Sequence, residues 1–92
     1  MTQKALQVKV FGMVQGVGFR YYTLRRAQHY RLNGYVKNLP DRTVEAYAEG
    51  AEETLQHFLA DLRRGPSGSQ VDDLKVEWLA YSGKYSGFDI TF

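Results

Sequence analysis

The spacing of apolar residues switches between two periods along this chain of 92 residues, and the order of the switches limits the folds that it can adopt. Apolar and polar residues alternate from residue 6, which predicts a half-buried strand that runs to about residue 14. Between residues 19 and 30, apolar residues recur every three or four positions, as on one face of a helix. Residues 34–38 and 44–49 favour two antiparallel strands, joined by a turn at 39–42 that contains Pro and Asp.

The clearest helix is predicted where Leu55, Phe58, Leu59 and Leu62 share one helical face, and Gly65-Pro66 should end it. Alternation returns at residues 74–78 and 88–92, which predicts two more strands. The order β-α-β-β-α-β, followed by a short final strand, indicates an α+β fold, a ferredoxin-like split βαβ sandwich. We expect an antiparallel sheet with two helices on one face. The other face should be partly wet, because it carries Lys9, Glu45 and Tyr47.

Length and composition restrict the classes of protein that remain. A chain of this size buries only about 60–65% of its unfolded surface, so residues 1–92 should form a single domain. The net charge of +2 is too small to indicate a nucleic-acid binder. The absence of cysteine excludes disulfides, thiolate nucleophiles and zinc–cysteine sites. We expect neither a signal peptide nor a membrane span, and therefore a cytoplasmic protein.

The segment 11–20 is the most informative for function. Its glycines join the first predicted strand to the first predicted helix, where unpaired N–H groups and the positive end of the helix dipole favour an anion. Arg20 lies in the first helical turn, where a cation opposes the dipole, and a bound phosphate would compensate. A tight turn with an idle arginine would look the same. The loop lacks the motifs of nucleotide and dinucleotide sites, so an ATP or NAD enzyme is not expected.

Two segments together identify a family. Residues 12–20, Gly-Met-Val-Gln-Gly-Val-Gly-Phe-Arg, resemble the first acylphosphatase signature, and residues 34–38, Gly-Tyr-Val-Lys-Asn, resemble the second. The signatures have the family's order and spacing, and Val44, Gly50 and the entry to the last strand at 86–88 also match. The resemblance covers essentially the whole chain.

The resemblance implies a metal-free hydrolase of acyl phosphates that forms no covalent intermediate and needs no cofactor. Arg20 would bind the substrate phosphate together with the loop formed by Gln15, Gly16, Val17, Gly18 and Phe19. Asn38 would orient the attacking water, although its residue type alone would better suit a side chain that caps a turn. Inorganic phosphate would be the product and a competitive inhibitor, and we expect a monomer.

One position departs from the family. Arg42 stands where the second signature usually has Gly, directly after Pro40-Asp41. That position should require a positive φ, which costs a residue with a Cβ about 1 kcal/mol or more. The turn that follows Asn38 is therefore expected to be strained.

Other polar residues have simpler explanations. His29 and His57 lie in different predicted helices without partners at metal-ligand spacing, so we expect both at the surface and no metal site. Asp72-Asp73 should be the polar start of a strand. The pairs Arg25-Arg26 and Arg63-Arg64 should be solvated. Tyr22 is expected in the core, while Tyr21 could line the mouth of the site.

Two other functions are compatible with the fold class. One is a non-catalytic module that binds RNA, but residues 44–50 contain one Tyr and two acids where such modules carry stacking aromatics. The other is a domain that handles carbamoyl phosphate, as in large hydrogenase-maturation proteins with an acylphosphatase-like unit. We expect small acyl phosphates as partners, with no nucleic acid and no membrane.

Overall fold

The first strand, β1, lies inside the sheet, with a neighbouring strand on each side. The computed structural model describes residues 2–92, and β1 spans Gln3–Met13. It pairs antiparallel with β3 (Val44–Ala51) on one side and with β4 (Gln70–Ala80) on the other. Leu6, Val8 and Val10 are buried, which confirms the predicted alternation.

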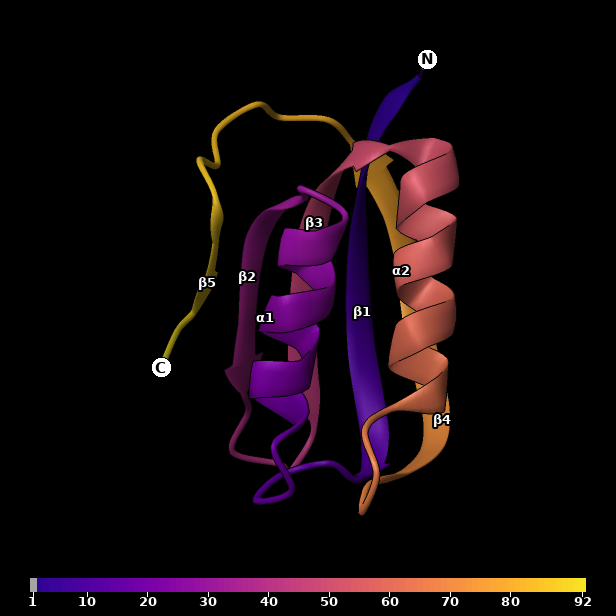
Figure 1. Ribbon diagram of the computed structural model, residues 1–92, viewed down its shortest axis with the longest axis vertical. Coiled ribbons are helices and arrows are strands. Elements are labelled where there is room, and N and C mark those ends of the chain that lie inside the picture. Colours follow the sequence, from indigo (N-terminus) through magenta and orange to yellow (C-terminus); the bar gives the residue numbers. More distant parts are fainter. Residues whose placement is uncertain (1) are drawn as a thin grey trace.

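The five strands are arranged in the order β4-β1-β3-β2-β5. β2 (Asn33–Asn38) pairs antiparallel with β3, and the short β5 (Phe88–Ile90) lies at the edge of the sheet. The prediction of a ferredoxin-like α+β fold is confirmed, except that β5 pairs parallel with β2. The reason is visible in Figure 1: the segment 81–87 crosses the end of the sheet, so that β5 begins where β2 begins.

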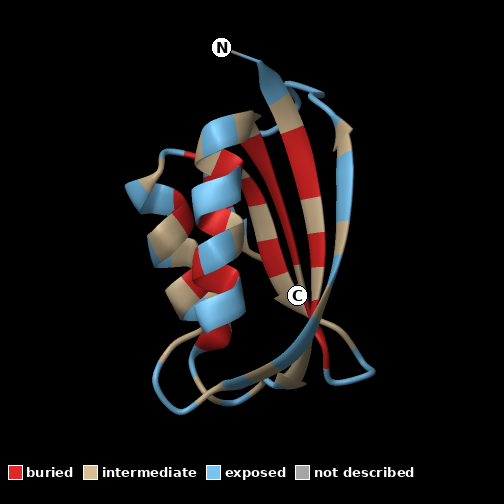
Figure 2. Cartoon of the chain, turned by 90° about the vertical axis from the view of Figure 1, so that its right-hand side faces the viewer, coloured by how far each residue is buried: buried red, intermediate tan, exposed pale blue. Residues whose placement is uncertain are grey.

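Both helices cover the same face of the sheet, as predicted (Figure 2). α1 spans Phe19–His29 and α2 spans Glu52–Arg64. Apolar side chains from both helices and four strands form one buried core. Full burial of a side chain such as Phe58 or Leu62 contributes about 1.5–3 kcal/mol. This core fixes where each helix begins relative to the strand ends.

The opposite sheet face differs from the prediction. Tyr47 lies on the face that was expected to be partly wet, but it is only 8% exposed, and Glu49 on the same face is 1% exposed. The segment 81–87 covers them: the Tyr85 ring lies 5.0 Å from the Tyr47 ring, and Glu49 accepts hydrogen bonds from Ser82. The segment 81–87, which leads to β5, therefore buries part of a sheet face that the strand patterns alone predict to be exposed to solvent.

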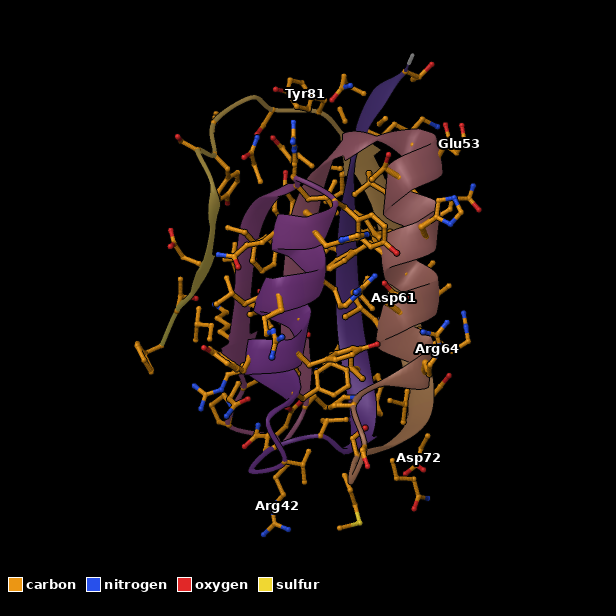
Figure 3. The ribbon with its side chains drawn as sticks, in the orientation of Figure 1. Arg42, Glu53, Asp61, Arg64, Asp72 and Tyr81 are labelled. Atoms are coloured by element: carbon orange, nitrogen blue, oxygen red, sulfur yellow. The ribbon has the colours of Figure 1, made fainter. Side chains whose placement is uncertain are left out.

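A polar network joins the two helices and corrects one prediction about the arginine pairs. Arg26 is not solvated like Arg25; its Nε lies 2.8 Å from the carboxylate of Asp61, which is 5% exposed and lies on α2 (Figure 3). Tyr30 donates a hydrogen bond to the same carboxylate, and the Tyr22 hydroxyl donates to the Asp61 carbonyl. Tyr22 is therefore half-buried, with a polar partner.

Most of the remaining surface predictions hold. His29, His57 and the pair Arg63-Arg64 are exposed, and Asp72-Asp73 are exposed near the start of β4. Trp78 continues the alternation of Leu74 and Val76 in the predicted strand, but it is 39% exposed. β4 is an edge strand, and Trp78 lies near its end, so fewer neighbours cover it.

Two arginines adopt the left-handed backbone conformation. Arg42 has a φ of 74°, which confirms the prediction, and it extends from the turn between β2 and β3 (Figure 3). Arg31 has a φ of 58° and follows the end of α1. There the N–H of Leu32 bonds to the Ala27 carbonyl and that of Arg31 to Gln28, the pairing of a Schellman motif, in which Gly is usual.

Candidate active site

The 14–18 loop connects β1 to α1 through two residues with positive φ. Gly16 and Gly18 have φ values of 75° and 78°, and Gly18 is the N-cap of α1. An added Cβ at either glycine would meet no atom within 4 Å, so the backbone conformation, not crowding, favours glycine there. No side chain caps this helix. The first N–H groups of α1 thus remain for a ligand.

The first turns of the two helices have opposite charges. The first turn of α1 contains no acidic residue and carries Arg20, whereas α2 begins with Glu52 and Glu53. Acidic residues near a helix N-terminus interact favourably with its dipole, and α2 has the expected arrangement. At α1 the favourable charge is missing and a cation is present, so this end is suited to an anionic ligand.

A cavity of about 300 Å³ lies at this end of α1 and brings the two predicted catalytic residues together. Arg20 enters it from the first turn of α1, and Asn38 enters it from the last position of β2. Its lining residues come from the loop, α1, β2 and the C-terminal segment: Val14, Gly16, Gly18, Phe19, Arg20, Tyr21, Asn38, Ile90 and Phe92. Gln15 and Val17 do not line it. Sequence reasoning missed Ile90 and Phe92, since their approach depends on the pairing of β5 with β2.

The guanidinium of Arg20 is available to a ligand. Of the ion pairs formed within residues 2–92, none involves Arg20. Its Cζ lies 5.9 Å from the centre of the Phe92 ring, which is fully exposed on its other sides. A guanidinium beside an aromatic ring keeps its planar set of donors free, and that set matches two oxygens of a phosphate.

Asn38 carries an unsatisfied polar atom. Among the described residues, its Oδ1 is the buried side-chain oxygen or nitrogen that lacks a hydrogen-bond partner. Leaving such an atom unpaired costs about 1–3 kcal/mol. Asn38 is the last paired residue of β2, opposite Val44, so the sheet fixes its backbone. Asn38 lines the cavity, so its unpaired oxygen is a candidate acceptor for a polar group of a ligand or for a water molecule.

The Gln15 side chain takes a different position from the rest of its loop. It points away from the cavity, toward the turn between β2 and β3, and its amide donates to the carbonyls of Leu39 and Thr43, each at 2.9 Å. Val17 packs against the core. For these two residues only the backbone remains available to a ligand.

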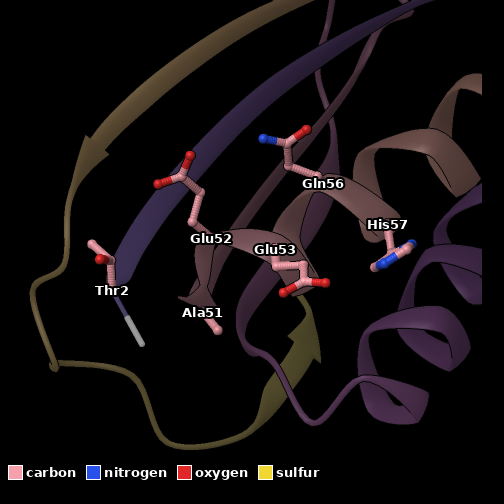
Figure 4. A pocket seen from close by; sticks show the side chains of 6 residues that line it. All are labelled: Thr2, Ala51, Glu52, Glu53, Gln56 and His57. Atoms are coloured by element: carbon pink, nitrogen blue, oxygen red, sulfur yellow. The ribbon is translucent and has the colours of Figure 1, made fainter.

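A larger cavity, of about 540 Å³, lies at the opposite end of the molecule, and Figure 4 shows its lining. Glu52 and Glu53 at the start of α2 contribute carboxylates, and Thr2, Ala51, Gln56 and His57 complete it. Two carboxylates repel a phosphate dianion. Within residues 2–92 no three His, Cys, Asp or Glu side chains are grouped to hold a metal ion. The larger cavity is therefore not suited to bind a phosphate, in contrast to the cavity at the N-terminus of α1.

Neither helix in the described part of the chain is long and apolar enough to cross a membrane.

Comparisons with known proteins agree with the geometry. The family model described as acylphosphatase matches residues 6–90. The acylphosphatase of Archaeoglobus fulgidus is 44% identical over 96% of this chain and 98% of its own length, and that of Thermotoga maritima is 43% identical over 97% and 98%. The crystal structure of the acylphosphatase from Bacillus subtilis has a TM-score of 0.94 at 37% identity, covering 97% of this chain and 99% of that chain.

A structure of full-length HypF in the phosphate- and nucleotide-bound form also matches, with a TM-score of 0.87 at 31% identity. The match covers 99% of this chain but 12% of HypF, so the shared unit is a small part of that protein. The free-standing relatives, in contrast, match over nearly their whole length. By its signatures, fold and relatives, this chain belongs to the acylphosphatase family.

Proposed function

We propose that this member of the acylphosphatase family hydrolyses acyl phosphates, releasing a carboxylate and inorganic phosphate, in the cavity at the N-terminus of α1. The observation that carries the proposal is that Arg20 and Asn38, whose Oδ1 is unpaired, line one cavity. One residue supplies charge for the phosphate, and the other supplies an acceptor for the water.

Arg20 and the N–H groups of residues 15–20 bind the phosphate. The guanidinium donates two parallel hydrogen bonds to two phosphate oxygens, while the loop and the first helical turn donate from the other side. These donors stabilise the charge that spreads over the phosphate oxygens in the transition state. Binding and catalysis thus use the same groups, so loss of Arg20 should affect both.

Asn38 positions the attacking water. Its Oδ1 accepts a hydrogen bond from the water, which leaves a lone pair of the water directed at phosphorus. The new bond forms between the water oxygen and phosphorus, and the bond from phosphorus to the acyl oxygen breaks. The carboxylate leaves with the bonding pair, and a phosphate oxygen accepts the proton of the water. Because a carboxylate is a good leaving group, no protein acid and no metal are needed.

The acyl group lies against the apolar part of the cavity. Ile90, Phe92 and Tyr21 form this wall, and none of them carries a charge that would select a charged acyl chain. We expect the enzyme to be a cytoplasmic monomer. Inorganic phosphate, the product, occupies the same donors and inhibits competitively.

Hydrolysis of benzoyl phosphate in water enriched in ¹⁸O tests this proposal. Attack on phosphorus places the label in inorganic phosphate, whereas attack on the carbonyl places it in benzoate. We expect turnover, with label in phosphate at or above the level given by the spontaneous reaction. Absence of turnover, or label in benzoate, would contradict the proposal.

The sheet face opposite the helices disfavours the alternative of an RNA-binding module. Tyr35 and Tyr47 stack on each other, with ring centres 5.6 Å apart. Their hydroxyls donate to Glu45 and Glu49, and Tyr85 lies over both rings. Rings held in this way are not free to stack on bases. A domain that only handles carbamoyl phosphate would show no turnover in the labelled-water experiment.

A further inference from the structure

Gln15 forms a bridge between the two halves of the proposed active site. Its side-chain Nε2 donates to the Leu39 carbonyl and to the Thr43 carbonyl, each at 2.9 Å. Gln15 belongs to the 14–18 loop, and both carbonyls belong to the turn that directly follows Asn38. The bridge therefore runs from the loop that leads to Arg20 to the segment that carries Asn38.

The chemistry of the bridge is specific to an amide. An NH₂ group has two hydrogens in one plane, and here each hydrogen meets one carbonyl. The same carbonyls also close the turn, because Leu39 O accepts from the Arg42 N–H and Thr43 O accepts from the Leu39 N–H. A neutral side chain without donors would leave the turn intact and remove only the bridge.

No other hydrogen bond in the described part of the chain links residues 14–18 to residues 38–43. The turn has its own supports: Asp41 accepts from the Thr43 N–H at 3.1 Å and pairs with Lys9 at 2.8 Å. None of these supports reaches the loop. The loop contains two positive-φ glycines, so its backbone has more freedom than its neighbours.

We propose that Gln15 is a positioning residue, which sets the distance between the phosphate-binding loop and Asn38 so that the water faces phosphorus in line. This inference rests on the proposed function. It assigns the Gln15 side chain a role in addition to the backbone N–H expected from the sequence. A shift of the water by about 1 Å can cost 10²-fold in rate, so one pair of hydrogen bonds at this place can matter for catalysis.

Gln15→Met is the first test, since Met has a similar length and no donor. We expect kcat for benzoyl phosphate to fall by about 10- to 100-fold. The inhibition constant of inorganic phosphate should change by less than about threefold, because the loop N–H groups and Arg20 still bind phosphate. Parallel loss of phosphate affinity would instead place Gln15 in the phosphate site, and unchanged kcat would overturn the inference.

A double-mutant cycle separates positioning from general stability. If Gln15 acts through Asn38, the loss caused by Gln15→Met should largely vanish in an Asn38→Ala background. If the loss of kcat in the double mutant equals the product of the two single-mutant losses, the two residues act independently and the inference is contradicted. The matched control is Tyr35→Phe, which removes a hydrogen bond from β2 to Glu45 on the opposite sheet face. Its kcat should equal that of the wild type, even if its melting temperature falls.

Gln15→Glu gives a second, pH-dependent readout if Gln15→Met does not fold. An ionised carboxylate would face two carbonyl oxygens and repel them, whereas a protonated carboxyl can donate to one. We expect its kcat, relative to wild type at each pH, to recover as the pH falls toward 5. A relative kcat independent of pH would argue against the bridge. Failure of the proposed function itself is distinguishable, because the wild type would then show no turnover.

Discussion

At the scale of single residues, Asn38 combines a catalytic role with a cost in stability. Its buried Oδ1 has no partner in the described structure, so removing the amide should not destabilise the fold. We expect Asn38→Ala to melt at the same temperature as the wild type or higher. Its kcat should fall by a factor that corresponds to about 2.7–4 kcal/mol, as for donors that stabilise a transition state.

Steady-state kinetics and thermal melts of Asn38→Ala check both parts. Phosphate inhibition should be preserved, since Asn38 contacts the water and not the phosphate. A variant that melts lower and keeps its kcat would show that Asn38 supports the turn and does not position the water.

Arg42 and Arg31 both hold a backbone conformation that favours glycine, with φ values of 74° and 58°. Removing the Cβ relieves about 1–2 kcal/mol of strain, and greater freedom of the unfolded chain offsets about 0.4–1 kcal/mol of it. Arg42→Gly should therefore stabilise the protein by about 0.5 kcal/mol, a rise of a few degrees at most in Tm.

Thermal melts of Arg42→Gly check this prediction, with Arg31→Gly as a comparison far from the cavity. Benzoyl phosphate kinetics should be unchanged or slightly faster in both variants. A lower melting temperature together with a lower kcat in Arg42→Gly alone would mean that the Arg42 side chain contributes to the site.

The sequence predicted the strain at Arg42 because turns are local: Pro40 and Asp41 determine what the next residue must do. It did not predict the pairing of Arg26 with Asp61, since the two are 35 residues apart and both resemble surface residues. It also did not predict the direction of the Gln15 side chain, whose partners lie 24 and 28 residues away. Single polar residues become predictable only when their partners are close in sequence.

At the scale of elements, Glu49 on β3 fastens the segment 81–87, which leads to β5. Its carboxylate accepts from the Ser82 N–H and hydroxyl, from the Gly83 N–H and from the Tyr47 hydroxyl. Farther along, the Gly87 N–H donates to Asn33. These bonds place β5, and β5 places Ile90 and Phe92 beside the cavity.

Glu49→Gln should loosen this segment, because an amide has one acceptor oxygen and turns its NH₂ toward donors. Hydrogen bonds to a charged group contribute about 1.5–3 kcal/mol, so we expect a loss of about that size in the free energy of unfolding. KM for benzoyl phosphate should rise as the wall of the cavity becomes less ordered.

Urea unfolding and steady-state kinetics provide the measurements. Glu45→Gln is the matched control, since Glu45 lies on the same face of β3 but is only half-buried. The changes in the free energy of unfolding and in KM caused by Glu45→Gln should be small. Equal effects of the two substitutions would show that Glu49 does not act through the segment 81–87.

The helices and the first four strands could be predicted because each repeats its pattern over several residues, and the structure extends most of them by only a few positions. The parallel pairing of β5 could not be predicted from its three residues. That pairing depends on Glu49 and Asn33, which no periodicity connects to the C-terminus. The part of the site that belongs to β1, α1 and β2 was therefore predicted, and the approach of Ile90 and Phe92 was not.

At the scale of the whole molecule, two buried carboxylates make stability depend on pH. Burial alone would raise the pKa of Glu49, but hydrogen bonds from Ser82, Tyr47 and Gly83 outweigh it and lower this pKa. Burial also raises the pKa of Asp61, but hydrogen bonds from Tyr30 and Arg26 lower it by more. The net effect is a lower pKa of Asp61. One carboxylate holds the segment 81–87, and the other joins α1 to α2.

A pKa that is lower in the folded state stabilises the fold above the pKa of the unfolded chain, and this contribution is lost as the pH falls below it. The free energy of unfolding should therefore be constant between about pH 5 and about pH 9 and decrease below about pH 4.5. Urea unfolding across this range checks the prediction, and Glu49→Gln should show a shallower decrease. Stability that increases on acidification would contradict it.

Hydrolysis by this fold should depend above all on Arg20, in a site that needs no metal. The most direct test is the initial rate of benzoyl phosphate hydrolysis in excess EDTA, for the wild type and for Arg20→Lys. Lysine keeps the charge but lacks the planar pair of donors that matches two phosphate oxygens. We expect full wild-type activity in EDTA and almost none for Arg20→Lys, with unchanged folding. Activity that EDTA removes and Mg²⁺ or Zn²⁺ restores, or near-normal turnover by Arg20→Lys, would contradict this expectation.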